Sequence, residues 1–219
     1  MGMERLRWLL PAAVLVAFVP VHVPALLLFP YEARGHGFVV RSETPLPPER
    51  IQPILAEAQR RLASSPLAAG RPDWNVYLTT GGWRWRWLAL NAANSFAVTR
   101  SLTNNTILNQ SDLATGRVRA PRAIGNSRLL ASDIAHETTH GLLYRHFGLW
   151  RTFAAPKWVV EGYCDYVAGE STLGAAEVAA LEARGIEHSA IDNYYARLRV
   201  DQTLAANGRS VDKLFEEAR

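Results

Sequence analysis

The stretch HETTHGLLYRH, residues 136–146, decides how this sequence is interpreted. It contains His136, Glu137 and His140 in the order His-Glu-x-x-His, and a third histidine, His146, follows six residues after His140. The longer segment SRLLASDIAHETTHGLLYRHFG carries apolar residues at helical spacing and ends at a glycine, which predicts a helix. Residues four apart lie on one face of a helix, so both imidazoles of the pair can reach one metal ion.

The pattern predicts a chemistry as well as a metal. Glu137, next to the first ligand, can act as a general base toward a water molecule that zinc activates, because zinc lowers the pKa of such a water toward neutrality. His-Glu-x-x-His alone is only moderately specific, since a surface helix with spare histidines would show the same letters. Catalytic zinc sites usually have three protein ligands, so a suitable third ligand would distinguish a metal site from a surface helix with spare histidines.

His146 is the nearest alternative for the third ligand, and helix geometry argues against it. Six residues of continuous helix rotate by about 600°, which leaves His146 about 120° away from His140. Metzincin peptidases use a histidine at this spacing, but they turn the chain with a glycine where this sequence has Leu143, and they need a downstream methionine turn. Met1 and Met3 are the only methionines here. We therefore expect His146 to lie outside the site as a cation at the helix end.

The segment WVVEGYCDYVAG, residues 158–169, supplies a better third ligand. Pro156 and Gly169 bound a second predicted helix, which a short loop can bring back antiparallel to the first. Glu161 on this helix is then aimed at the metal. Asp165 lies four residues later on the same helix face and is placed to accept the outer N–H of a ligating histidine. The alternative for Asp165 is an ordinary solvated acid.

Together, ASDIAHETTHGLLY and WVVEGYCDYVAG resemble the gluzincin zinc peptidases, particularly the small peptidase-MA-like domains, whose second helix carries W-x-x-E-G-x-A-x-Y. The resemblance is specific over about residues 129–169 and looser elsewhere. It implies one Zn²⁺ as cofactor, with Glu161 as the third ligand beside His136 and His140. It also implies that Glu137 is the catalytic base and that Asp165 supports a ligand from the second shell of the metal. Cys164 stands where the family commonly has a small residue, and we expect it to pack in the core.

The resemblance also indicates how substrate would bind. In gluzincins the active-site helix flanks a sheet whose edge strand pairs with an extended peptide. The candidate edge strand here is NSFAVT, residues 94–99, with an internal strand as the alternative; its substrate-contacting residues would be Asn94, Ser95, Phe96 and Ala97. Stabilisation of the developing oxyanion needs a further donor. No motif identifies it, and the downstream candidates are His188, Tyr194 and Tyr195.

The remaining sequence predicts an α+β class and, with the resemblance, a zincin-like domain: a helix, a small mixed sheet, then helices only. A helix is expected within residues 47–66, starting near Pro48, and strands are expected over 74–80, 95–101 and 105–110. GGWRWRWLAL, residues 81–90, alternates Trp with Arg, which predicts a strand whose Trp face packs in the core; a strand at a membrane interface or against substrate is the alternative. Further helices are expected over 174–185, 189–208 and 210–219.

The N-terminal segment predicts a membrane association. No charged residue occurs between Trp8 and Phe29, and about 20 apolar residues suffice to cross a bilayer. We predict that residues 1–30 form an uncleaved transmembrane anchor, which places the domain on the extracytoplasmic side. The alternative is a cleaved secretory signal and a secreted protein. Residues 31–46 are predicted to form a linker, and residues 47–219 the catalytic domain.

The amino-acid composition limits which classes of fold and function are plausible. The chain has 219 residues, 48% hydrophobic and 20% charged, which is typical of one globular domain with an appendage. A net charge of +4 with no run of Lys or Arg gives no reason to expect nucleic acid as a partner. One cysteine excludes an intrachain disulfide framework.

The leading prediction is therefore a membrane-anchored zinc metallopeptidase that hydrolyses a peptide or protein substrate. The competing hypothesis is a non-catalytic zincin-like scaffold that binds peptides or partners in the cell envelope. The presence of Glu137 beside all three ligands favours the enzyme, because loss of the base alone would be the simplest route to a scaffold.

Overall fold

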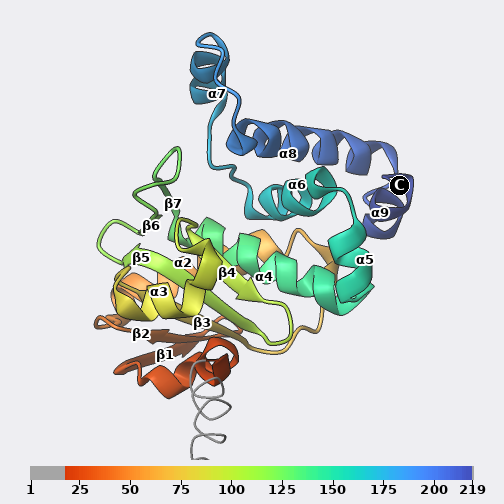
Figure 1. Ribbon diagram of the computed structural model, residues 1–219. Coiled ribbons are helices and arrows are strands. Elements are labelled where there is room, and N and C mark those ends of the chain that lie inside the picture. Colours follow the sequence, from red (N-terminus) through yellow and green to blue (C-terminus); the bar gives the residue numbers. More distant parts are fainter. Residues whose placement is uncertain (1–17, 219) are drawn as a thin grey trace, which may run out of the picture.

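The computed structural model describes residues 18–218, which form a seven-stranded mixed sheet with helices on both faces (Figure 1). The strand order is β1-β2-β3-β5-β6-β7, and β4 pairs with β5. The pairs β2–β3 and β3–β5 are parallel, and the other pairs are antiparallel. The expected α+β class is confirmed. The strands are β1 (Tyr31–Gly35), β2 (Phe38–Ser42), β3 (Trp74–Thr79), β4 (Ala97–Arg100), β5 (Asn105–Asp112), β6 (Arg117–Arg119) and β7 (Ser127–Leu129).

The helices expected after the sheet are present, but the first of them begins at Leu130, because the predicted residues 127–129 form strand β7, and a short helix over 149–154 was not predicted. Gly148 ends the first of them, and Gly169, in the left-handed conformation at φ 64°, ends the second. Ser210 caps the last helix, because its side chain accepts a hydrogen bond from the Lys213 N–H. The α-helices are α2 (Pro48–Leu62), α3 (Trp83–Ala89), α4 (Leu130–Phe147), α5 (Leu149–Ala154), α6 (Lys157–Ala168), α7 (Ala175–Glu182), α8 (Ser189–Ala206) and α9 (Val211–Glu217).

The main hydrophobic core lies between one face of the sheet and helices α2, α4 and α6. In Figure 1, α4 lies against the sheet, and α6 and α8 lie beyond it. Gly141 permits the close approach of α4 to β3, because a Cβ atom at this position would lie 2.0 Å from the ring of the buried Trp74. The helix that carries His136 and His140 is thus held directly on the sheet.

The alternating Trp-Arg segment was predicted to be a strand, and this prediction is wrong. Residues 83–89 form α3, which covers the sheet face opposite α4 and contributes to a second core with Tyr77 and Ile107. Because β3 and β5 are parallel neighbours, the chain between them must cross a face of the sheet, and α3 lies in that connection. In a strand the three tryptophans would share one face, whereas in the helix Trp85 points to a different side from Trp83 and Trp87. Accordingly, Trp85 is 2% exposed, and Trp83 and Trp87 are 55% and 37% exposed.

The prediction of a linker over residues 31–46 is also wrong for most of its length. Residues 31–42 form the antiparallel hairpin of β1 and β2, and β2 continues the sheet by pairing in parallel with β3. Val40 and Phe38 of β2 are buried in the main core. The domain therefore begins before residue 47.

The predicted membrane anchor falls partly outside the described residues, since residues 1–17 are not described. The last part of the apolar run packs on the domain: Val21 is buried, the carbonyl of His22 accepts a hydrogen bond from Asn105 at 2.9 Å, and Leu27 accepts one from Arg84 at 2.9 Å. The ring of Phe29 packs on Tyr77 with centroids 5.2 Å apart. Within residues 18–218, no helix combines the length and apolarity required to cross a membrane.

Candidate metal centre and adjoining cleft

Three side chains from α4 and α6 converge on one point. The Nε2 atoms of His136 and His140, one helical turn apart on α4, are 3.2 Å apart. Glu161, near the start of α6, places Oε2 at 3.7 Å from His136 Nε2 and Oε1 at 3.7 Å from His140 Nε2. The helix pairing expected from the sequence is confirmed, because α4 and α6 pack together and bring these residues into contact.

The spacing of these atoms suits a tetrahedral ion. Zinc bound at about 2.0–2.2 Å to nitrogen and oxygen in tetrahedral geometry would hold its ligand atoms roughly 3.4 Å apart. The three separations of 3.2, 3.7 and 3.7 Å lie close to that value. The Nδ1 atom of His140 is buried and has no hydrogen-bond partner among the described residues. His136, His140 and Glu161 therefore fit a Zn²⁺ ion.

Asp165 fixes the orientation of the first histidine. Its Oδ1 atom lies 2.8 Å from His136 Nδ1 and both side chains are buried, so the Nε2 atom of His136 is directed toward His140 and Glu161. Such a carboxylate sets the tautomer of a metal-binding histidine. The position predicted for Asp165 is thus confirmed: it contacts a histidine and is not a solvated surface acid.

Arg128, a residue that the sequence did not single out, anchors this carboxylate from the other side. Its guanidinium donates to Asp165 Oδ1 at 3.0 Å and to the Glu170 carbonyl at 3.2 Å, and its Nε lies 3.3 Å from Asp133 Oδ1. Arg128, Asp133 and Asp165 are all buried, so these charges offset one another in a region of low dielectric. The network joins β7, the first turn of α4 and the middle of α6.

Burial and charge shift the pKa values of this network in opposite directions. Burial alone would lower the pKa of His136, but the hydrogen bond and negative charge of Asp165 outweigh it and raise the pKa to about 9. Burial alone would raise the pKa of Asp165, but His136 and Arg128 hold it below its usual value. Burial, only partly offset by Arg128, raises the pKa of Asp133 to about 6.

A glycine next to Glu161 lets α8 pack tightly on α6. A Cβ atom at Gly162 would lie 2.6 Å from the carbonyl oxygen of Ala196 on α8, so a larger residue would push the two helices apart. Ser132 Oγ donates to the Ala168 carbonyl at 3.0 Å, which ties the start of α4 to the end of α6. Helix α6, which carries Glu161, is therefore held between α4 and α8.

Cys164 is a second neighbour of the histidines. Its thiol, with ligand atoms of His136 and His140, forms a set of three atoms within 4.8 Å of one another. Cys164 is fully buried in the main core, as expected from the sequence. Burial and the nearby carboxylates of Glu161, Glu137 and Asp165 raise the pKa of the thiol well above its usual value. The protonated thiol packs beneath the site, whereas Glu161 faces the cleft.

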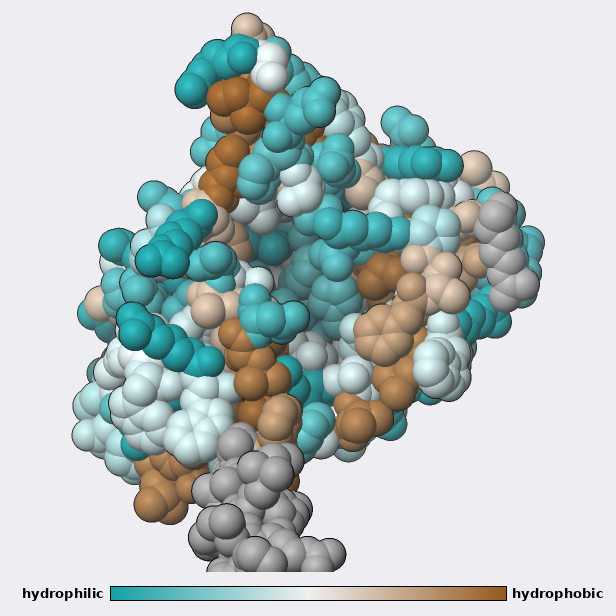
Figure 2. All heavy atoms as spheres, viewed as in Figure 1, coloured by the Kyte–Doolittle hydropathy of each residue, from teal (hydrophilic) through white to brown (hydrophobic). Residues whose placement is uncertain are grey.

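A cleft of about 460 Å³ opens over these residues, and Figure 2 shows a hollow lined by hydrophilic residues near the middle of this face. Its floor carries His136, His140, Glu161 and Glu137. Glu137 is largely buried on α4 and lines the cleft. One wall is formed by residues 94–97, so the structure brings together the predicted metal ligands, the predicted base and the predicted substrate-contacting segment.

Strand β4 lies at an edge of the sheet beside α4. Among residues 18–218 it pairs only with β5, which leaves its outer backbone edge without a strand partner. Asn94 and Ser95 precede the strand, and Phe96 contributes its carbonyl to a hydrogen bond with Asn109 N–H at 2.8 Å. The prediction of an edge strand is confirmed, with the strand itself beginning at Ala97.

A row of hydrogen bonds fixes β4 relative to α4. The Trp74 indole N–H donates to Thr106 Oγ1 at 2.9 Å, Thr106 and Thr99 are joined through their hydroxyls at 3.0 Å, and Thr99 Oγ1 donates to the Glu137 carbonyl at 2.8 Å. The row starts at β3, passes through β5 and β4, and ends at the residue predicted to be the base. The edge strand and the helix therefore share a defined register.

The other predicted residues divide between the cleft and the surface. His188 lines the cleft, although its Nδ1 accepts the Ala190 N–H at 3.0 Å and caps α8. Tyr194 packs in a small separate core, and the exposed Tyr195 donates to Glu182 at 3.0 Å, so neither lines the cleft. His146 lies outside the site, as expected, and its Nε2 lies 2.8 Å from Asp212 Oδ1.

Comparisons with known proteins give no match. The chain matches no protein-family model, no curated protein and no solved structure.

Proposed function

We propose that this protein is a zinc-dependent peptidase with a zincin-like catalytic domain. The observation that carries the proposal is the convergence of His136, His140 and Glu161 at separations close to those of a tetrahedral zinc site, with Glu137 on the same cleft. The Asp165 contact to His136 adds the orienting carboxylate that such sites use. The proposal rests on this geometry and on the resemblance of the two helical motifs to the gluzincins.

The residues of the cleft would have separate roles in the proposed reaction. A bound zinc ion would supply Lewis-acid polarisation of water and of the substrate carbonyl. His136, His140 and Glu161 would hold the ion, and Asp165 with Arg128 would keep His136 in position. Glu137 would take a proton from the attacking water and deliver it to the leaving amine, the general base and general acid roles of one carboxylate.

The substrate proposed is an extended peptide. The outer edge of β4 has backbone N–H and C=O groups without a strand partner among residues 18–218, and these can pair with an added strand. Residues 94–97 line the cleft beside the metal-binding side chains, so a peptide on this edge would pass over them. A scaffold that only binds peptides would need the same edge but would not need Glu137.

The test compares the full chain with its Glu137→Gln variant. Both proteins are loaded with zinc, their metal content is measured, and each is incubated with a mixed peptide library analysed by mass spectrometry. We expect about one zinc in each protein and hydrolysis only by the wild type, with a loss in Glu137→Gln of roughly a hundredfold or more, as for removal of a general base. Glu49→Gln, an exposed acid at the start of α2, is the matched control and should retain activity.

Two outcomes would reject parts of the proposal. Zinc bound by the wild type without hydrolysis of any library peptide would favour the binding scaffold. A wild-type protein that binds no zinc would reject both the metal centre and the peptidase.

A further inference from the structure

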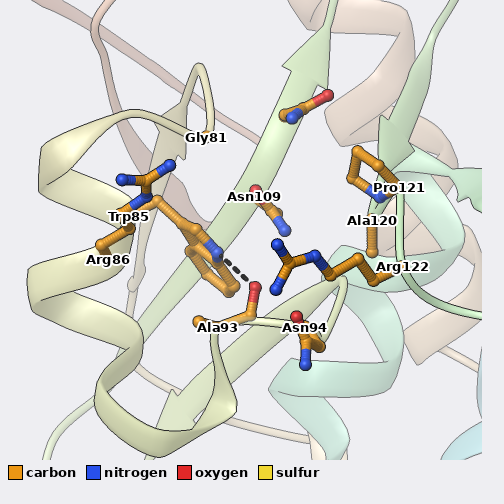
Figure 3. Close-up of a pocket in the computed structure, with 10 residues that line it drawn as sticks. Gly81, Trp85, Arg86, Ala93, Asn94, Asn109, Ala120, Pro121 and Arg122 are labelled. Carbon is orange, nitrogen blue, oxygen red and sulfur yellow. Dashed lines mark hydrogen bonds between the residues drawn. The ribbon is translucent and has the colours of Figure 1, made fainter.

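A second hollow, of about 430 Å³, adjoins the cleft (Figure 3). It lies between α3, the segment before β4, strand β5 and the connection from β6 to β7. The two hollows share Asn94 and Arg122, which therefore stand between the proposed metal centre and the second hollow.

Two arginines give this hollow an uncompensated positive charge. Figure 3 shows the Arg122 guanidinium reaching into the middle of the hollow near Asn109 and Asn94, while Arg86 comes from α3 on the other wall. Neither arginine has an ion pair with any residue in the range 18–218, and no acidic residue lines the hollow. By contrast, the neighbouring Arg84 is paired with Glu43 at 3.1 Å. Unpaired guanidinium groups in a concave site attract carboxylates.

Hydrogen bonds that do not involve the arginines fix the walls of the hollow. The Trp85 indole N–H donates to the Ala93 carbonyl at 2.9 Å, and the Asn109 amide donates to the Ser95 carbonyl at 2.9 Å. Gly81 approaches so closely that a Cβ atom there would lie 2.4 Å from Gln110 Cγ. These contacts shape the hollow without using the Arg122 guanidinium, which remains available for a ligand.

The hollow lies where a peptide on β4 would continue. Ala93 and Asn94 precede the strand, and residues 94–97 line the cleft above the metal-binding side chains. A peptide paired with this edge and passing over the metal centre would reach Asn94 and Arg122 next. We propose that this hollow is a carboxylate-binding subsite, in which Arg122 binds an acidic side chain or the C-terminal carboxylate of the peptide substrate. This inference rests on the proposed peptidase function.

The experiment measures specificity with matched peptides. At each position along a cleaved library sequence, Glu is compared with Gln, and every peptide is made with a free or an amidated C-terminus. For the wild type we expect kcat/KM to be about tenfold higher for the acidic member at one position or for the free C-terminus, as for a charge-assisted contact at a partly exposed site. The position, or the C-terminus, that gives the effect identifies the source of the carboxylate.

The variants assign the preference to Arg122. In Arg122→Gln the ratio of kcat/KM for the acidic peptide to kcat/KM for the neutral peptide should fall to nearly one, while the neutral peptide is still hydrolysed. Arg122→Lys should retain part of the preference for the acidic peptide. Arg119→Gln removes an exposed arginine that lines neither hollow, and it should leave the ratio unchanged. The wild-type ratio should also decrease when salt is raised to about 0.5 M, because exposed charges are then screened.

A wild type without any acidic preference, or an Arg122→Gln variant that keeps it, would overturn the inference. Calorimetric binding of the same peptides to the zinc-loaded wild type and to Arg122→Gln separates this result from failure of the peptidase proposal. Arg122-dependent binding of acidic peptides without hydrolysis would support the subsite and reject the peptidase. Equal binding of acidic and neutral peptides by a protein that does not hydrolyse them would reject both.

Discussion

The proposed metal centre has two candidates for its third ligand, Glu161 and Cys164, which lie three residues apart on α6. Both approach His136 and His140. Glu161 presents one oxygen to each imidazole from the cleft, whereas the Cys164 thiol is buried and its pKa is raised. The Cys164 thiol, whose pKa is raised by burial, would have to lose its proton before it could bind zinc, which favours Glu161 as the ligand.

Substitution of these two residues separates their roles. We expect Glu161→Ala to weaken zinc binding by roughly tenfold or more, since a ligand is lost, and Cys164→Ala to retain about one zinc. Cys164→Ala should still lower stability slightly because it removes a buried sulfur atom. Metal content after dialysis against a weak chelator measures both effects. Loss of zinc in Cys164→Ala with retention in Glu161→Ala would reverse the assignment.

His136 also makes the stability of the metal-free protein depend on pH. Its pKa in the folded protein is about 9, above the value near 6.5 of an unfolded histidine. The stabilising contribution of protonated His136 is therefore fully present below about pH 6.5 and is lost as the pH rises through about 9. Urea unfolding of chelator-treated protein between these pH values should show this decrease, and Asp165→Asn should reduce it. A wild-type free energy of unfolding that matches Asp165→Asn at every pH would contradict the contact.

The positions of the predicted site residues, though not their roles, follow from local sequence patterns. His136, Glu137 and His140 follow from one helical turn, and Glu161 and Asp165 follow from the next helix. Arg128 could not be predicted, because its partners Asp165 and Glu170 meet it only after α6 has folded back on β7. Tyr194 and Tyr195 were selected by their position after the motif, but on α8 Tyr194 packs in a separate small core and Tyr195 donates to Glu182 at the surface.

At the scale of elements, the wrong prediction for residues 83–87 came from a sequence pattern that is compatible with both a strand and a helix. Trp and Arg alternate in residues 83–87, yet the same spacing places Trp83 and Trp87 one helical turn apart, and the crossover from β3 to β5 selects the helix. The hairpin of β1 and β2 was missed although its signal is local: the two-residue turn His36-Gly37, with positive φ at both residues, fixes the register of the two strands. Strands β3 and β5, whose residues are mostly buried, were predicted correctly.

The contact between α4 and the sheet depends on Gly141. In Gly141→Ala, the added methyl group would overlap the buried Trp74 ring, so we expect a loss of roughly 1–3 kcal/mol of stability or more. Gly174→Ala is the control, because its methyl group would approach only the Glu177 carboxylate, at 3.6 Å; its effect should be below about 1 kcal/mol. Urea unfolding measures both. Equal stability of Gly141→Ala and the wild type would show that α4 is not held against Trp74.

At the scale of the whole molecule, the N-terminal segment leads into the domain without a spacer. Residues 21–29 contact the sheet face that α3 covers. We propose that the preceding apolar residues anchor the protein in a membrane, with the cleft on the extracytoplasmic side. Carbonate extraction of membranes from expressing cells should leave the full chain in the pellet. Recovery in the soluble fraction, with a mass that lacks the first residues, would support the cleaved and secreted alternative instead.

The metal centre is the claim on which the proposed function and its inferred subsite both depend. X-ray absorption spectroscopy at the zinc edge of the zinc-loaded protein tests it most directly, because it reports the ligand atoms and their distances. We predict two imidazole nitrogens and carboxylate oxygen at about 2.0–2.2 Å, from His136, His140 and Glu161. A sulfur ligand at about 2.3 Å would contradict this centre by placing Cys164 on the metal.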